Sequence, residues 1–195
     1  MTISKLMQRA MILMSLAGLV LLSACAESDD DFDLKTGHFY DSAVKNLKYK
    51  TATGDGTTDE KGTFWYIEGE DITFSVGNLA IGATVKAKSI MTPVDLVPEA
   101  TYANCDIKEV KDIAHFLQRL DTNQNPDDGI IEICDKVHEE LEEDAKSWHM
   151  GLTSVALKEL SDAKVITPYT RTPDDALNHL KIQIKELKIN DPDEA

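Results

Sequence analysis

Long apolar runs, basic residues, aromatic residues and cysteines are all scarce in this chain of 195 residues. The first apolar stretch, Ala10 to Leu22, has about 13 residues, short of the roughly 20 that a membrane-spanning helix needs. Lysine and arginine number 20 against 35 acidic residues, a formal net charge of −15. This charge opposes electrostatic binding to nucleic acid or an anionic membrane surface, so we expect no nucleic-acid partner.

Signatures of catalysis and of zinc binding are also missing. The five histidines form no His-Glu-x-x-His and no paired His/Cys spacing, which argues against a zinc site. No Gly-x-Ser-x-Gly stretch is present, although a Ser/His/Asp triad assembled by the fold remains open. We therefore expect a protein that is not an enzyme.

The N-terminus has the pattern of a secretory signal peptide over residues 1–24. Lys5 and Arg9 precede the apolar stretch, and small residues follow it. The sequence Leu-Ser-Ala-Cys, Leu22 to Cys25, resembles the lipobox of bacterial lipoproteins. The resemblance implies that Cys25 becomes the first mature residue and carries lipid, including palmitate. An ordinary cleaved signal and a membrane anchor are the alternatives.

The residues after Cys25 predict the location of the mature protein. In the lipoprotein sorting pattern that this stretch resembles, an Asp directly after the lipidated Cys would favour inner-membrane retention, and this chain has Ala26 there. The resemblance therefore implies, in a Gram-negative host, anchoring to the outer membrane, facing the periplasm or the surface. Cleavage removes two basic residues and no acidic one, which makes the net charge −17. Residues 25–37 follow as an acidic flexible tether, to which Leu34 belongs unless it adds an edge strand.

The pattern beyond the tether predicts an α+β fold. Residues 38–98 contain short β-rich stretches, and apolar and polar residues alternate from Ile72 to Val76, which favours a small antiparallel β-sandwich-like unit. Trp65 and Tyr66 are neighbours in one stretch, so we expect one to point outward. It could stack on a sugar ring or a partner, or the pair could be a core aromatic with one exposed neighbour that binds nothing.

Helical spacing replaces the alternation in residues 99–190, where we expect three to four helices. Apolar residues recur at three- and four-residue steps from Ile107 to Leu120. The sequence Thr-Pro-Asp-Asp at 172–175 predicts the start of the last helix, with a capping residue, an early proline and acid in the first turn. Residues 191–195 are expected to form a disordered tail.

Two cysteines remain once Cys25 is lipidated. Cys105 and Cys134 form an even pair in an oxidising compartment, so we expect a disulfide between them, with two buried free thiols as the alternative. The bridge would close a loop of about 29 residues and stabilise the fold by roughly 3–4 kcal/mol.

One stretch has the oxygen spacing of a calcium-binding EF-hand loop. Pro126 replaces the glycine that this loop needs at its sharp turn, so a structural turn between helices is the alternative. No cofactor other than calcium is a candidate. The candidate ligands at loop positions 1, 3, 5, 7 and 12 are Asp121, Asn123, Asn125, Asp127 and Glu132.

A further resemblance is carried by short stretches spread over the body of the chain, at 41–44, 47–49, 57–59, 62–64, 72–77, 79, 81–82, 92–96, 116–121, 126–130 and 176–180. Together they resemble a module of secreted proteins and lipoproteins of marine-type gammaproteobacteria, and this resemblance implies no activity. We expect a non-enzymatic, lipid-anchored cell-envelope protein that binds or presents a partner, either a protein or a glycan. The alternatives are an accessory or assembly lipoprotein of a periplasmic or outer-membrane complex, and an enzyme with an unrecognised site.

Overall fold

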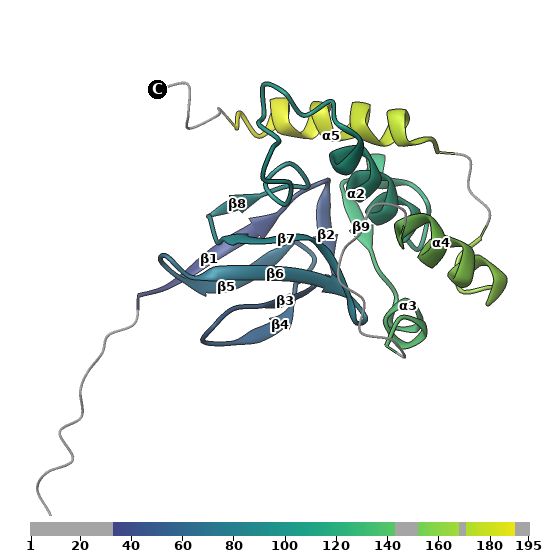
Figure 1. The fold of residues 1–195 in the computed structure, drawn as a ribbon, viewed down its shortest axis with the longest axis horizontal. Helices are drawn as coiled ribbons and strands as arrows, with labels where there is room; N and C mark the ends of the chain where they lie inside the picture. Colours follow the sequence, from purple (N-terminus) through teal and green to yellow (C-terminus); the bar gives the residue numbers. More distant parts are fainter. Residues whose placement is uncertain (1–32, 143–151, 168–170, 190–195) are drawn as a thin grey trace, which may run out of the picture. The chain divides into compact units, whose positions relative to one another are not determined.

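The computed structural model describes residues 33–142, 152–167 and 171–189. Strands come first and helices follow, which confirms the predicted α+β class, with four α-helices among the described residues (Figure 1). The predicted signal peptide and the tail at 191–195 lie outside these residues. The elements are β1 Leu34–Phe39, β2 Ala43–Lys45, β3 Lys48–Lys50, β4 Asp55–Thr57, β5 Thr63–Ile67, β6 Asp71–Val76, β7 Leu79–Lys86, β8 Ile90–Met91, α2 Lys108–Arg119, η1 Pro126–Asp128, β9 Ile130–Glu132, α3 Asp135–Glu140, α4 Leu152–Asp162 and α5 Pro173–Glu186.

Two small sheets pack face to face through aromatic side chains. Their strand orders are β5-β1-β8 and β4-β3-β6-β7, and every pair is antiparallel except β1 with β8. The Phe74 ring of β6 lies 4.7 Å from that of Phe39 on β1 and 5.4 Å from that of Phe64 on β5, measured between centroids. These rings form the apolar layer of the sandwich-like unit.

β1 is the middle strand of its sheet and begins at Leu34. The tether predicted for residues 25–37 is therefore wrong from Leu34 onward, and residues 25–32 lie outside the described part. The apolar alternation that would predict this strand is broken, because Gly37 occupies one of its inward-facing positions. A Cβ there would lie 2.2 Å from the ring of Phe64, so a residue with no side chain fills a core position.

A parallel strand pair joins the two halves of the chain. β9 lies beside β2, with Ala43 opposite Ile130 and Lys45 opposite Glu132. β9 belongs to the segment predicted as the helical unit 99–190, yet it adds to the strand-rich part. Strands and helices share one hydrophobic core, and the chain from Asp33 onward forms one compact unit. The boundary predicted at residues 98 and 99 therefore does not separate two compact units.

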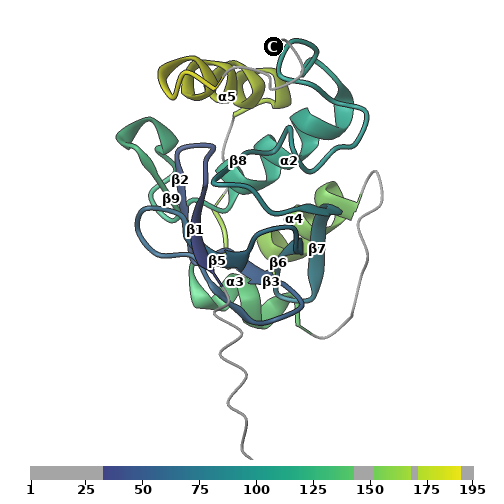
Figure 2. The same cartoon turned by 90° about the vertical axis from the view of Figure 1, so that its left-hand side faces the viewer.

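Two helices, α4 and α5, pack against α2, which also contacts β7 (Figures 1 and 2). The start of α5 is confirmed as predicted, with Pro173 in its first turn. The Thr172 side chain accepts the backbone N–H of Asp175 at 3.2 Å, and the Asp175 carboxylate accepts the backbone N–H of Thr172 at 3.0 Å. This reciprocal cap fixes the direction in which α5 leaves the preceding loop.

An irregularity in β7 connects the four-stranded sheet to the segment before α2. The β6–β7 register shifts at Gly82, which has a φ of +66°, and the next N–H, of Ala83, donates to the Leu96 carbonyl at 2.8 Å. Glycine is needed because a Cβ would lie 2.6 Å from that of Leu96.

Among the described residues, no helix has the length and apolarity to cross a membrane.

Candidate functional site

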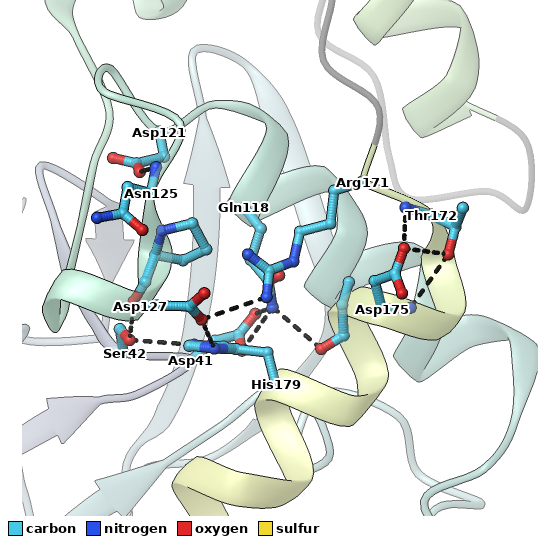
Figure 3. A network of polar contacts seen from close by, with 12 residues as sticks. Asp41, Ser42, Gln118, Asp121, Asn125, Asp127, Arg171, Thr172, Asp175 and His179 are labelled. Atoms are coloured by element: carbon cyan, nitrogen blue, oxygen red, sulfur yellow. Dashed lines mark hydrogen bonds and ion pairs between the residues drawn. The ribbon is translucent and has the colours of Figure 1, made fainter.

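A buried carboxylate and a buried amide meet where the turn after β1, α2 and α5 come together (Figure 3). Both oxygens of Asp41 accept hydrogen bonds from Gln118 Nε2 at 2.9 Å, and the same nitrogen donates to the Ala176 carbonyl at 3.1 Å. Loss of hydration raises the pKa of Asp41 well above its ordinary value, although Gln118 and the nearby Arg171 favour the charged form. The contacts tie the turn to both helices.

Ser42, His179 and Asp127, here called the Ser42 cluster, lie beside this pair (Figure 3). Ser42 Oγ lies 3.1 Å from His179 Nε2, and His179 Nδ1 lies 2.8 Å from Asp127 Oδ1. Burial, with a smaller effect of Arg171, lowers the pKa of His179. Partial burial acts to raise the pKa of Asp127, but Arg171 and His179 outweigh it and lower this pKa.

These distances match a Ser/His/Asp catalytic triad, but the exposures are the reverse of what catalysis needs. Ser42 is 1% exposed, whereas the Asp127 side chain is 66% exposed. A hydrolase instead buries the acid and opens the serine to substrate. The Ser42 hydroxyl also donates to the Pro126 carbonyl at 2.7 Å, closer than His179, and a hydroxyl has only one hydrogen. The geometry supports a structural contact between the β1–β2 turn, η1 and α5.

The predicted calcium loop is closed by its own hydrogen bonds. The Asp121 carboxylate accepts the backbone N–H groups of Asn125 at 2.8 Å and Glu132 at 3.1 Å. The Asn123 side chain accepts the same Asn125 N–H at 2.8 Å and donates to Asp128 at 2.6 Å. These are the local turn contacts that Asn and Asp commonly make.

The remaining candidate ligands point away from that loop. Glu132 forms an ion pair with Lys45 of β2 at 2.5 Å, and Asp127 turns to His179. Within the described ranges no three His, Cys, Asp or Glu side chains are grouped so as to hold a metal ion. The predicted ligand set is therefore not assembled, and the loop is a turn that leads from α2 to β9.

The cysteines at 105 and 134 are both free thiols, so the predicted disulfide is not formed. Cys105 is buried and lines a cavity of about 240 Å³ beside α5, together with Lys181 and Ile184. Cys134 is the residue before α3, after β9. An even number of cysteines carries no information on whether two of them lie within bonding distance.

The outer face of the β5-β1-β8 sheet exposes the predicted aromatic. Trp65 is 50% exposed and Tyr66 only 4%, which confirms the expected alternation. Trp65 lies opposite Thr36, and Ile67 lies opposite Leu34, which is 56% exposed. Opposite residues in an antiparallel pair share one side of the sheet. The Trp65 face is made of Leu34, Thr36, His38, Thr63, Trp65 and Ile67.

Two backbone N–H groups of the edge strand β5 are occupied by side chains. The Thr63 N–H donates to Asp59 at 2.9 Å, and the Ile67 N–H donates to Glu70 at 2.8 Å. The hydrogen bond from Ile67 is the main reason that the pKa of Glu70 is lowered. Occupied donors at both ends of an edge strand oppose the addition of another strand.

No family model, curated protein or solved structure matches the chain. The roles of the residues above therefore follow from their geometry alone.

Two further results concern the predicted residues. Cys25 lies outside the described residues, so its lipidation stays a prediction. Sequence reasoning missed Asp41, Ser42, Gln118 and His179, which share no motif; Ser42 and His179 lie 137 positions apart. The only local sign is the positive φ of Ser42, 60°, and that is visible only in the structure.

Proposed function

We propose that this protein is a non-enzymatic lipoprotein of the bacterial cell envelope, held to the outer membrane through Cys25, and that it binds a partner through the Trp65 face. The observation that carries the binding role is the half-exposed Trp65 beside the exposed Leu34, on a sheet whose other side faces the core. Tryptophan offers a large apolar area at low entropic cost, which is why it is enriched where proteins bind.

The two alternatives have less support. An assembly role through the helices would need a continuous apolar patch, whereas the exposed Val155 and Ile182 lie on different helices, α4 and α5. An enzymatic role would use the Ser42 cluster. Ser42 is closed to substrate, and the cavities of about 520, 390 and 240 Å³ outlined by described residues are lined by other residues.

Anchoring is tested by mass spectrometry of the mature N-terminal peptide and by cell fractionation. We expect diacylated Cys25 at the mature N-terminus, protein in the membrane fraction, and release of a Cys25→Ser variant. Wild-type protein without lipid on Cys25 would refute the anchor.

Binding is tested by crosslinking in cells with a photoreactive residue in place of Trp65. The matched control carries the same residue in place of Ile182, which is equally exposed at 55% but lies on α5. We expect a partner, lipid or macromolecule, captured at position 65 and not at 182. Equal capture at both positions would refute a specific role of the Trp65 face.

A further inference from the structure

We propose that the Trp65 face docks on the surface of the same membrane to which Cys25 is attached. This inference rests on the proposed function and names the partner of its binding surface. It assigns to the exposed tryptophan the role of a second, reversible membrane contact beside the covalent lipid.

The length of chain between anchor and body favours this partner. Leu34 is the first residue of β1 and lies nine positions after Cys25. At roughly 3.6 Å per residue, the start of β1 stays within about 32 Å of the lipidated residue. Trp65 lies opposite Thr36, two positions further along β1, so the most exposed apolar residues of the sheet lie where the chain enters the body. The tether thus keeps this end of the sheet at high effective concentration near the bilayer.

The chemistry of the face also fits a lipid surface. Tryptophan prefers the boundary between headgroups and acyl chains. Lys35, which follows Leu34 in β1, is paired with Glu68 at 2.5 Å, and this ion pair neutralises the lysine at this end of the sheet. Trp65 lines none of the three cavities described above, whereas a small ligand needs a concavity. The acidic chain limits the match to membranes of low surface charge.

The orientation of the body is compatible with docking. Both views place the start of β1 on the side of the body away from α5 (Figures 1 and 2). A bilayer that meets the start of β1, at Leu34, therefore lies on the side of the body away from α5.

The test is tryptophan fluorescence in a Trp148→Phe background, where Trp65 is the only tryptophan. The lipidated protein is placed in phosphatidylcholine vesicles. In a second arm, a Cys25→Ser chain with an N-terminal histidine tag is held on the same vesicles by a nickel-chelating lipid. We expect a blue-shifted Trp65 emission that is quenched by lipids brominated near the headgroups. Leu34→Ser should lower the ratio of membrane-docked to undocked protein about fivefold. This is the change expected when the burial of about half a leucine side chain against the membrane is lost.

Ile182→Ser is the matched control, since Ile182 is 55% exposed against 56% for Leu34. Equal emission with and without vesicles, or equal effects of the two substitutions, would overturn the proposal. A Trp65 response to soluble glycan fragments would overturn it in favour of a sugar ligand, and a response to protein concentration would do so in favour of a second copy. The tagged arm does not need lipidation, so failure of docking and failure of the Cys25 anchor are distinguishable.

Discussion

Replacing His179 by alanine tests whether the Ser42 cluster holds the fold together. The ring is 4% exposed and bridges Asp127, at 2.8 Å, and Ser42, at 3.1 Å. Loss of the hydrogen bonds is worth about 1 kcal/mol net, because Asp127 is largely exposed and solvent-screened. The void left by the buried ring adds roughly 2 kcal/mol. We expect the free energy of unfolding to fall by about 3 kcal/mol.

Urea denaturation at pH 7 measures this change, with an unaltered m-value as the check for two-state unfolding. In a thermal scan the expected loss is about 6–12 °C for a chain of this size. His38→Ala is the matched control. His38 lies on the Trp65 face, where its ring is only partly buried and bonds to the Lys61 carbonyl at 3.3 Å, and we expect a loss below about 1 kcal/mol.

Equal losses for the two alanine variants would refute the structural role of the Ser42 cluster. A double-mutant cycle between His179→Ala and Asp127→Ala sharpens the test, with an expected coupling of about 0.5–1 kcal/mol. A fluorophosphonate probe provides the catalytic counterpart. Because Ser42 is closed to solvent, we expect no labelling, and labelling that a Ser42→Ala variant loses would show that the serine is a nucleophile.

Three further predictions concern acid, the β7 bulge and the thiols. We expect the free energy of unfolding to fall as the pH drops below about 6.5. Burial lowers the pKa values of His115, His138 and His179 in the folded protein. The unfolded chain therefore binds protons on these histidines at a higher pH than the folded protein does, and acid favours unfolding. The raised pKa of Asp41 lets the folded protein bind a proton in acid, which offsets part of this fall. Asp41→Asn removes this offset, so we expect the stability of the variant to fall more steeply with acid. Urea midpoints that stay constant from pH 7 to 5 would contradict both statements. Gly82→Ala should lower the free energy of unfolding by about 2–3 kcal/mol, because alanine is strained at this positive φ and its Cβ would clash with Leu96. A loss below about 1 kcal/mol in the same urea assay would contradict this prediction. Titration of the unreduced protein with a thiol reagent should find Cys105 and Cys134 free, with Cys134 reacting first because it is less buried; a mass two hydrogens lower would show the disulfide instead.

The parts of the fold that the sequence predicts are those whose signals are local. The capping residues at 172–175 contact one another within a single turn, and the alternation of Trp65 and Tyr66 needs only the geometry of one strand. The order of strands and helices follows from the change of period along the chain.

The parts that sequence reasoning misses depend on pairing between distant residues. β9 has only three residues, too few for a periodic pattern, and it becomes a strand by pairing with β2. The Gln118 amide nitrogen and the Asp41 carboxylate meet across 77 positions of the sequence, which no local rule reports. The disulfide prediction was wrong for the same reason, because counting cysteines leaves out where the fold places them.

The β2–β9 pair also sets the order in which the chain can fold. β2 obtains this partner only after residue 132 is available, and the turn after β1 contacts α5 only after residue 179. Contacts of such long sequence separation form slowly, because loop closure must precede them. An N-terminal segment that emerges from the ribosome therefore cannot reach the native state alone.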